Sequence, residues 1–207
     1  DDTAYLSWTP ASAGNRKTFT WSGWVKRGNL SSWQMIFAAG TTSADRTYLA
    51  INDSNYIVFN HIASATPVFY ANTDRVFRDT SAWYHLVLVC DLANTSVDLY
   101  VNGEPITWTV TAGSFQNVNT YINNTTAHFI SKSSFADQEY LDGYLANVHF
   151  IDGQALTASD FGETKNGVWV AKDYAGTFGT NGFHLTFEDD TEVEAFNTVL
   201  FRATGTQ

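Results

Sequence analysis

The stretch WYHLVLVCDLANTSVDLYVNGEPI, residues 83–106, contains two strand-like segments followed by a tight turn. In residues 96–101, apolar side chains alternate with more polar ones, which is the pattern of a strand with one buried face. Asn102-Gly103 favours the positive φ values of a type I′ hairpin turn, which sends the chain back through residues 104–110. The segment Leu86–Cys90 is apolar at every position, so we expect a central strand that is covered on both faces.

The rest of the chain shows the same pattern, in which short strand-like segments are separated by clusters of Gly, Asn, Asp and Ser. Only residues 156–163, LTASDFGE, indicate a helix, in which Thr157 can cap a short turn that Gly162 can end. This pattern predicts an all-β sandwich or barrel. The predicted strands lie at residues 4–8, 18–26, 33–40, 46–51, 56–60, 67–71, 83–92, 96–102, 104–110, 127–132, 140–151 and 182–187.

The composition is that of a globular domain and excludes several partners. Hydrophobic residues make up 44% of the 207 residues and aromatic residues 15%, which is enough apolar surface for one large core. The formal net charge of −10 would repel phosphate backbones, so we expect no nucleic-acid partner. No run approaches the roughly 18 apolar residues that span a bilayer, so we expect no membrane insertion. The single cysteine, Cys90, lies in an apolar strand and is predicted to be a core residue.

Three motifs, taken in order, carry a family resemblance. They are FTWSGWVKR at residues 19–27, the pair WYHLVLVCD and VDLYVNGE at residues 83–91 and 97–104, and DGYLANVHFIDGQALTASDF at residues 142–161. Together they resemble the laminin-G-like, concanavalin A-like lectin fold. The resemblance implies an all-β jelly-roll sandwich of two antiparallel sheets, and we expect residues 1–187 to form this domain.

A narrower resemblance links residues 4–28 and 142–187 to lectin-like domains of tail-fibre and other virion proteins of marine bacteriophages. The ending FNTVLFRATGTQ, residues 196–207, is similar to the start of a domain that often follows in such proteins. We therefore interpret residues 188–207 as a linker and the start of a following region. The resemblance implies an extracellular virion location, contacts with other virion proteins, and a homo-oligomer that is a trimer if the protein is a fibre.

A sugar-binding surface needs an exposed aromatic ring beside amide and carboxylate groups, because pyranose faces are apolar while their edges carry hydroxyls. Trp33 and Tyr140 lie at predicted strand ends, with Asn29, Asp137 and Gln138 near them in the sequence. These five residues form the predicted carbohydrate-binding set. The alternative interpretation is that the two rings pack at the sandwich rim.

No cofactor motif is present, and the histidines lack the spacing of a zinc site. His85 and His149 alternate with apolar neighbours, so we expect them to be packed or hydrogen-bonded. The resemblance to laminin-G-like domains implies that calcium can bind at the sandwich rim, for which Asp137, Asp142 and Asp152 are the candidate ligands. The alternative is that these aspartates only serve their own turns.

Glu188, Asp190 and Glu192 have the E-x-D-x-E spacing of laminarinase-like glycoside hydrolases, which share this fold. Period-two spacing would align the three carboxylates on one face, as paired-carboxylate catalysis requires. Asp189 and Thr191 would then face the core, where burial of an unpaired carboxylate costs several kcal/mol. We therefore interpret this segment as a solvated acidic linker and expect no catalytic residues.

These observations predict a non-catalytic virion domain, part of a tail fibre or appendage, that binds host surface carbohydrate. One alternative is a structural spacer or decoration domain that binds only neighbouring virion proteins. The other is a polysaccharide-degrading enzyme on the same fold. Fold alone does not decide between them, because one fold supports many functions.

Overall fold

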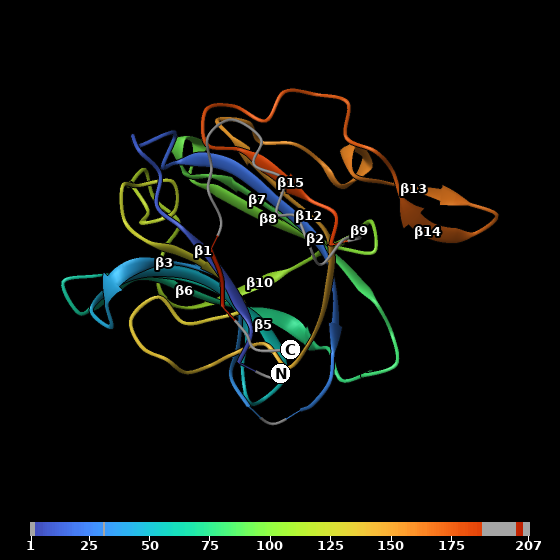
Figure 1. The fold of residues 1–207 in the computed structure, drawn as a ribbon, viewed down its shortest axis with the longest axis horizontal. Helices are drawn as coiled ribbons and strands as arrows, with labels where there is room; N and C mark the ends of the chain where they lie inside the picture. The colour runs from blue at the N-terminus through green and yellow to red at the C-terminus, as the bar shows by residue number, and fades with distance from the viewer. Residues whose placement is uncertain (1–2, 31, 188–201, 205–207) are drawn as a thin grey trace.

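The computed structural model describes residues 3–30, 32–187 and 202–204. It shows two antiparallel β-sheets packed face to face, with a two-stranded hairpin projecting from one end (Figure 1). The predicted all-β sandwich of two antiparallel sheets is confirmed. In this described part of the chain, no helix has the length and apolar character needed to cross a membrane.

The larger sheet has eight strands, in the order β10 (Trp108–Gly113), β6 (Thr66–Val76), β5 (Tyr56–Ala63), β4 (Asp45–Ile51), β3 (Gln34–Thr42), β11 (His128–Ile130), β1 (Tyr5–Trp8) and β16 (Arg202–Thr204). The smaller sheet has six, in the order β15 (Phe183–Leu185), β12 (Gly143–Asp152), β2 (Thr18–Arg27), β7 (Tyr84–Asp91), β8 (Ser96–Val101) and β9 (Glu104–Ile106). The remaining elements are the hairpin β13 (Gly162–Lys165) and β14 (Val168–Ala171), and two short 3₁₀ turns, η1 (Leu92–Asn94) and η2 (Ala158–Asp160).

Strand β7 is the central strand that the sequence predicts. It lies between β2 and β8, and all of its residues from Leu86 to Cys90 are buried. Leu86, Leu88 and Cys90 point into the main core, whereas Val87 and Val89 belong to a second cluster on the outer face of the sheet. Both faces of the strand are therefore covered, and burial raises the pKa of the Cys90 thiol, as expected of a core cysteine.

Aromatic rings from both sheets fill the space between them. The ring centroid of Phe150 on β12 lies 5.7 Å from that of Phe37 on the opposite sheet and 5.7 Å from that of Phe19. Trp8 on β1 stacks on Phe37 and meets the edge of Phe183. Both Trp8 and Phe150 are buried in this core. Because each fully buried Phe contributes about 1.5–3 kcal/mol, these rings supply much of the attraction between the sheets.

The second cluster is covered by residues 153–180, which cross the outer face of the smaller sheet. Phe161 and Ala158 from this segment pack on Val87 and Ile151, and other apolar side chains of the segment surround them. The predicted helix over 156–163 is only the 3₁₀ turn η2, in which the backbone N–H of Thr157 donates to the Asp160 carboxylate. We refer to residues 153–180 as the strap.

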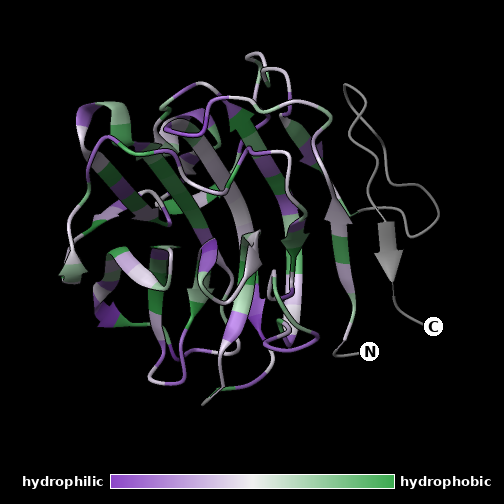
Figure 2. Cartoon of the chain, turned by 90° about the vertical axis from the view of Figure 1, so that its left-hand side faces the viewer, coloured by the Kyte–Doolittle hydropathy of each residue, from purple (hydrophilic) through white to green (hydrophobic). Residues whose placement is uncertain are grey.

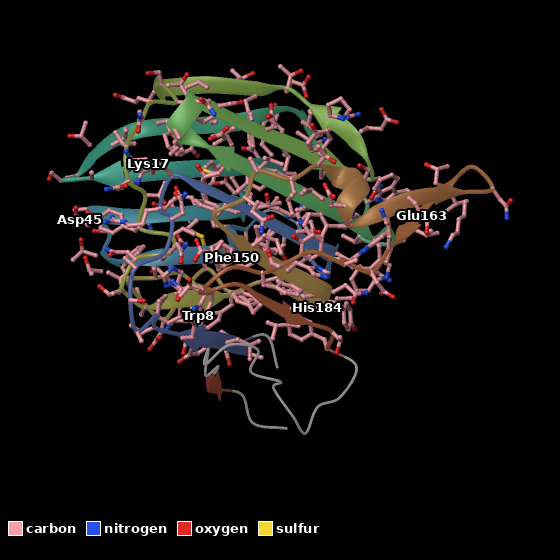
Figure 3. All side chains as sticks on the ribbon, turned by 90° about the horizontal axis from the view of Figure 1, so that it is seen from above. Trp8, Lys17, Asp45, Phe150, Glu163 and His184 are labelled. Atoms are coloured by element: carbon pink, nitrogen blue, oxygen red, sulfur yellow. The ribbon has the colours of Figure 1, made fainter. Side chains whose placement is uncertain are left out.

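The strap also contains the hairpin β13–β14, which is absent from the sequence-based prediction. Its turn is Asn166-Gly167, with φ values of 53° and 80°, and this dipeptide is the usual signal of a type I′ hairpin. The indole N–H of Trp169 donates to His85 Nδ1 at 2.9 Å, which ties the hairpin to β7. Figure 3 shows Glu163 on this projecting hairpin, away from the body of the sandwich.

The predicted strand over 104–110 is wrong in one respect, because the structure divides it between the two sheets. Ile106 pairs with Leu99 in the smaller sheet, whereas Trp108 pairs with Thr73 in the larger one. The chain crosses between the sheets at Thr107, whose carbonyl accepts the backbone N–H of Asp74. The period-two pattern continues through this crossing, so the sequence carries no sign of the change of sheet.

Residues 202–204 form β16, which pairs with β1 at the edge of the larger sheet. This short part of the predicted linker therefore adds a strand to the sandwich. The remaining residues of that segment, 188–201 and 205–207, and with them Glu188, Asp190 and Glu192, lie outside the described residues.

The aromatic core leads to a direct stability test. Replacing Phe150 by Ala should lower the free energy of unfolding by about 3–5 kcal/mol, since it leaves a cavity among packed rings. Tyr144→Ala is the matched control, because Tyr144 lies on the same strand and its side chain is 65% exposed. Urea unfolding of both variants measures the difference, and equal losses would contradict this description of the core.

Four of the five histidines are buried, namely His61, His85, His128 and His149. Burial lowers the pKa of His61 and of His128 from 6.5 to about 4, so both are neutral in the folded protein. His128 Nε2 accepts the backbone N–H of Asn123, and His61 Nδ1 shares a hydrogen bond with the Thr47 hydroxyl. The unfolded chain therefore binds protons in a pH range where the folded chain does not.

We expect stability to fall as the pH drops from about 7 to 5. The depressed histidine pKa values contribute stability above pH 6.5, and this contribution is lost progressively toward about pH 4. The carboxylates of Asp45 and Asp79, whose pKa values are also lowered by hydrogen bonds, act at lower pH because their ordinary value is 3.8. Urea midpoints at the two pH values provide the measurement, and equal midpoints would rule out the neutral buried histidines.

Candidate functional site

A hollow of about 290 Å³, open to solvent, lies on the outer face of the larger sheet. This volume is close to the lower end of the usual range for sites that bind small molecules, about 300–1,000 Å³. Residues of β3, β4, β5 and β6 form the floor of the hollow. Trp33 and Glu139, which lie outside these strands, form its side. The residues that line the hollow are Trp33, Met35, Arg46, Tyr48, Asn60, Ile62, Pro67, Tyr70 and Glu139.

The centre of the floor is a cross-strand row. Tyr48 on β4 pairs with Asn60 on β5, and Asn60 pairs with Tyr70 on β6. Because successive side chains of a strand point to opposite faces, Leu49 and Phe59 beside this row point into the main core. Figure 2 shows hydrophobic and hydrophilic residues alternating along the strands in this way. Burial of the apolar residues therefore sets the polar row on the outer face.

Asn60 is the most deeply placed polar group of the hollow, with 2% of its surface exposed. Its amide nitrogen donates to the hydroxyl of Tyr48 at 2.8 Å. Its amide oxygen is buried and has no hydrogen-bond partner among the described residues. An unpaired buried polar atom costs free energy, so this oxygen is well placed to bind a ligand group that donates a hydrogen bond.

Arg46 and Glu139 are the two charged residues among those that line the hollow. The guanidinium of Arg46 lies over the Tyr48 ring at 4.9 Å and over the Phe135 ring at 4.4 Å. Arg46 Nε and Nη1 and Glu139 Oε2 are buried and, in the described part of the chain, form no hydrogen bond. The backbone carbonyl of Glu139 accepts the N–H of Met35 at 2.8 Å, which fixes this residue beside β3.

Both tyrosines of the row remain protonated at neutral pH. Burial raises the pKa of Tyr70 to about 12 and also raises the pKa of Tyr48. Their hydroxyls therefore act as neutral groups that can donate as well as accept. Together with the apolar side chains of Ile62, Pro67 and Trp33, they give a surface that suits a ligand with both apolar faces and polar edges.

Of the five residues predicted to bind carbohydrate, Trp33 lines the hollow. Its ring meets the edge of Tyr48, with 6.3 Å between the ring centroids. Tyr140 instead packs near Tyr5, with 6.3 Å between their centroids, which is the rim packing given as the alternative.

The three polar members of that set lie outside the lining. The side chain of Asn29 bonds to Gln34 and to the Asp142 carboxylate. Asp137 forms an ion pair with Lys132, and the backbone of Gln138 accepts a hydrogen bond from Ser133. The structure therefore places Trp33 beside Glu139 in the hollow and uses Asn29 and Asp137 in contacts within the chain.

The sequence analysis did not select the strand residues that line the floor of the hollow. Asn60 is a polar residue at the end of the segment YIVFN, residues 56–60, directly after three apolar residues, and this was the available signal. Tyr48 and Tyr70 are ordinary strand residues by composition. Their meeting across three strands depends on the pairing register, which the sequence does not state.

The three candidate calcium ligands are not brought together. Asp142 and Asp152 lie at opposite ends of β12, and ten residues of extended strand span about 30 Å. The Asp152 carboxylate is buried and accepts the backbone N–H of Asn15 and the amide of Asn123. Among residues 3–30, 32–187 and 202–204, no group of three or more His, Cys, Asp or Glu side chains is arranged to hold a metal ion.

A second, much smaller cavity lies under the strap. It is lined by Trp24, His85, His149 and His184, together with residues of the strap. The rings of His149 and His184 stack with centroids 3.9 Å apart, and both rings bond to oxygens of Asn147. His85 and His149 are thus packed and hydrogen-bonded, as the sequence predicts.

The contacts of Asp152 lead to a second stability test. Asp152→Asn should lower the free energy of unfolding by about 1.5–3 kcal/mol, since it replaces an oxygen that accepts N–H groups by an amide that donates. Asp137→Asn should lower stability less, because the Asp137 side chain is 81% exposed and the ammonium of its buried partner Lys132 keeps its contacts with the rings of Tyr5 and Phe129. Thermal and urea unfolding compare the two, and an unchanged Asp152→Asn protein would contradict the structural role.

Solved structures of known proteins share the sandwich. A candidate carbohydrate-binding protein from Bacteroides ovatus is 18% identical, with a TM-score of 0.57, and 74% of this chain aligns with 42% of that one. The heptameric SAP-like pentraxin from Limulus polyphemus is also 18% identical, with a TM-score of 0.51, over 74% of this chain and 71% of that one. The CBM40 of a Ruminococcus gnavus IT-sialidase is 12% identical, with a TM-score of 0.51, over 77% and 96%. At these identities the likeness shows the fold alone, and the chain spans less than half of the B. ovatus protein.

The sequence comparisons agree with this fold. No curated protein sequence is similar enough to match the chain. Residues 1–161, however, match the family model of the concanavalin A-like lectin/glucanases superfamily. That match covers most of the chain, including all three strands that meet in the Asn60 row and the paired strands β7 and β8. The chain therefore belongs to the concanavalin A-like lectin/glucanases superfamily.

Proposed function

We propose that the chain is a non-catalytic carbohydrate-binding domain and that the hollow on the larger sheet is its binding surface. The observation that carries this proposal is the buried amide of Asn60, whose oxygen has no partner among the described residues and lies at the centre of a floor flanked by tyrosine rings. A pyranose has apolar faces and hydroxyl edges, so it matches a surface that mixes rings with unpaired polar atoms. The B. ovatus protein is described as a candidate for carbohydrate binding and the R. gnavus domain is the CBM40 of a sialidase, and both support the same ligand class.

In the described part of the chain, the lining of the hollow contains a single carboxylate, which supports binding without catalysis. Retaining glycosidases place two carboxyl groups about 5–5.5 Å apart, and inverting ones place them about 6.5–9.5 Å apart. Glu139 is the one acidic side chain among the residues that line the hollow. The alternative of a polysaccharide-degrading enzyme rests on Glu188, Asp190 and Glu192, outside the described residues. Release of reducing ends from a bound polysaccharide that is lost in Glu188→Gln would overturn the non-catalytic proposal.

We further propose that the domain belongs to a phage tail fibre or appendage, where it meets host surface carbohydrate and neighbouring virion proteins. The support is the resemblance of residues 4–28 and 142–187 to virion lectin-like domains. Several copies, as in a trimer, would multiply a weak affinity at each site. Mass spectrometry of particles made by a phage that encodes this chain provides the test, and absence of its peptides would contradict the assignment. A virion that contains a domain with no glycan affinity would favour the spacer alternative.

The hollow is tested by a pair of tryptophan variants. Trp33→Ala should weaken glycan binding at least tenfold, about 1.4 kcal/mol, because it removes a wall of the hollow. Trp83→Ala is the matched control, since Trp83 lies beside β7 of the other sheet and is 38% exposed. A glycan array with the 207-residue chain identifies a ligand, and titration calorimetry then compares the two variants.

Three outcomes count against the hollow as a glycan site. Loss of binding in Trp83→Ala, with Trp33→Ala unchanged, would move the site to the other sheet. Equal affinity in both variants and the parent would place it away from both residues. If the protein binds no glycan of a broad array, the proposal of carbohydrate binding is overturned and the spacer domain is favoured.

A further inference from the structure

We propose that the hollow selects neutral, hydroxyl-bearing pyranoses over sugars that carry a carboxylate. This selectivity rests on the proposed carbohydrate-binding function and adds to it the class of sugar that binds. It follows from the polar atoms of the hollow that are buried without a partner within residues 3–30, 32–187 and 202–204, and from the charges of the lining.

The Asn60 amide sets the first requirement. Its nitrogen bonds to the Tyr48 hydroxyl at 2.8 Å, and its oxygen, which is buried and unpaired, requires a donor. If the amide were turned over, the tyrosine would donate to the oxygen and the nitrogen would require an acceptor. A sugar hydroxyl satisfies both orientations, because it donates and accepts. A carboxylate is acceptor-only, so it cannot pair with the amide oxygen, and it could pair with this amide only in the turned orientation.

Arg46 sets the second requirement. In the described part of the chain, its Nε and Nη1 atoms are buried without a partner, and the N–H bonds of these two atoms diverge. The two oxygens of one carboxylate cannot accept from both atoms at once. Two separate oxygens, such as two hydroxyls or a hydroxyl and a ring oxygen, can do so. The rings of Tyr48 and Phe135 beneath the guanidinium hold it in this orientation.

Glu139 sets the third requirement. Its buried Oε2 is an unpaired acceptor, so it favours a ligand that donates. Arg46 and Glu139 are the two charged residues of the lining, and their charges of +1 and −1 cancel. A uronic acid would gain from Arg46 but would be opposed by the Glu139 carboxylate. A neutral sugar pairs with both residues and leaves no buried charge uncompensated.

Matched sugars that differ only at C6 separate the two classes. Galacto-oligosaccharides and galacturono-oligosaccharides of equal length and linkage form one pair, and the glucose and mannose series with their uronic acids form two more. In every pair whose neutral member binds, titration calorimetry should show that the neutral member binds at least about tenfold more tightly than its uronic acid. Its affinity should change little with salt concentration, whereas attraction of a uronate by Arg46 would be screened.

Two variants link this preference to the hollow. Asn60→Leu keeps the size of the side chain and should weaken binding of the neutral sugar at least about tenfold. Glu139→Gln removes the negative charge beside Arg46 and should raise the affinity for the uronic acid at least about threefold. Glu139 lies at the side of the hollow, so this variant keeps the test decisive if Asn60→Leu does not fold. Thermal unfolding checks the folding of each protein.

Each remaining outcome has a distinct meaning. A uronic acid that binds as tightly as its neutral partner, or more tightly, would overturn the selectivity and leave carbohydrate binding intact. A neutral preference that persists unchanged in Glu139→Gln and in Asn60→Leu would place the selection elsewhere and overturn the role of these residues. If no member of the three pairs binds, the selectivity is overturned. If, in addition, no glycan of the array binds, the proposed function is overturned as well.

Discussion

Burial of Leu49, Phe59 and Phe69 against the smaller sheet is the constraint on which the candidate site depends. Because side chains alternate along a strand, placing these residues in the core places the Asn60 row on the outer face. A register slip of one residue would send the polar row inward and expose the aromatic side chains. The free energy of the core therefore holds in place a buried amide that would be costly on its own, and the fold determines the position of Asn60 before any ligand is present.

The two outer faces of the sandwich have different roles for a physical reason. The smaller sheet presents Val87, Val89 and Ile151 outward, and the strap covers them with apolar side chains. The larger sheet presents a mixture of apolar and polar side chains around Asn60, and it has a hollow instead of a cover. An apolar outer face is stabilised by further packing, whereas a face with buried unpaired polar atoms is stabilised by a polar ligand.

The sequence analysis predicted the strands well where the local pattern is strong, and less well where a contact distant in sequence decides. The apolar run around Val87 indicated a central strand because only cover on both faces permits such a run. The crossing between Ile106 and Trp108 was missed because each half pairs with a strand of a different sheet. Trp33 could be selected as a surface ring near a strand end, but Asn60 resembled any polar residue within a strand.

The sequence by itself determined the all-β class, the antiparallel pairing of its hairpins and the family, because alternation, turn dipeptides and motif order are local properties of the chain. Only the tertiary structure decided which polar residues meet. Tyr48, Asn60 and Tyr70 come from three strands whose register is set by packing against the opposite sheet, and Glu139 joins them from a segment far along the chain. A site assembled from such distant segments has no local signature, since its geometry is a consequence of how the whole core is filled.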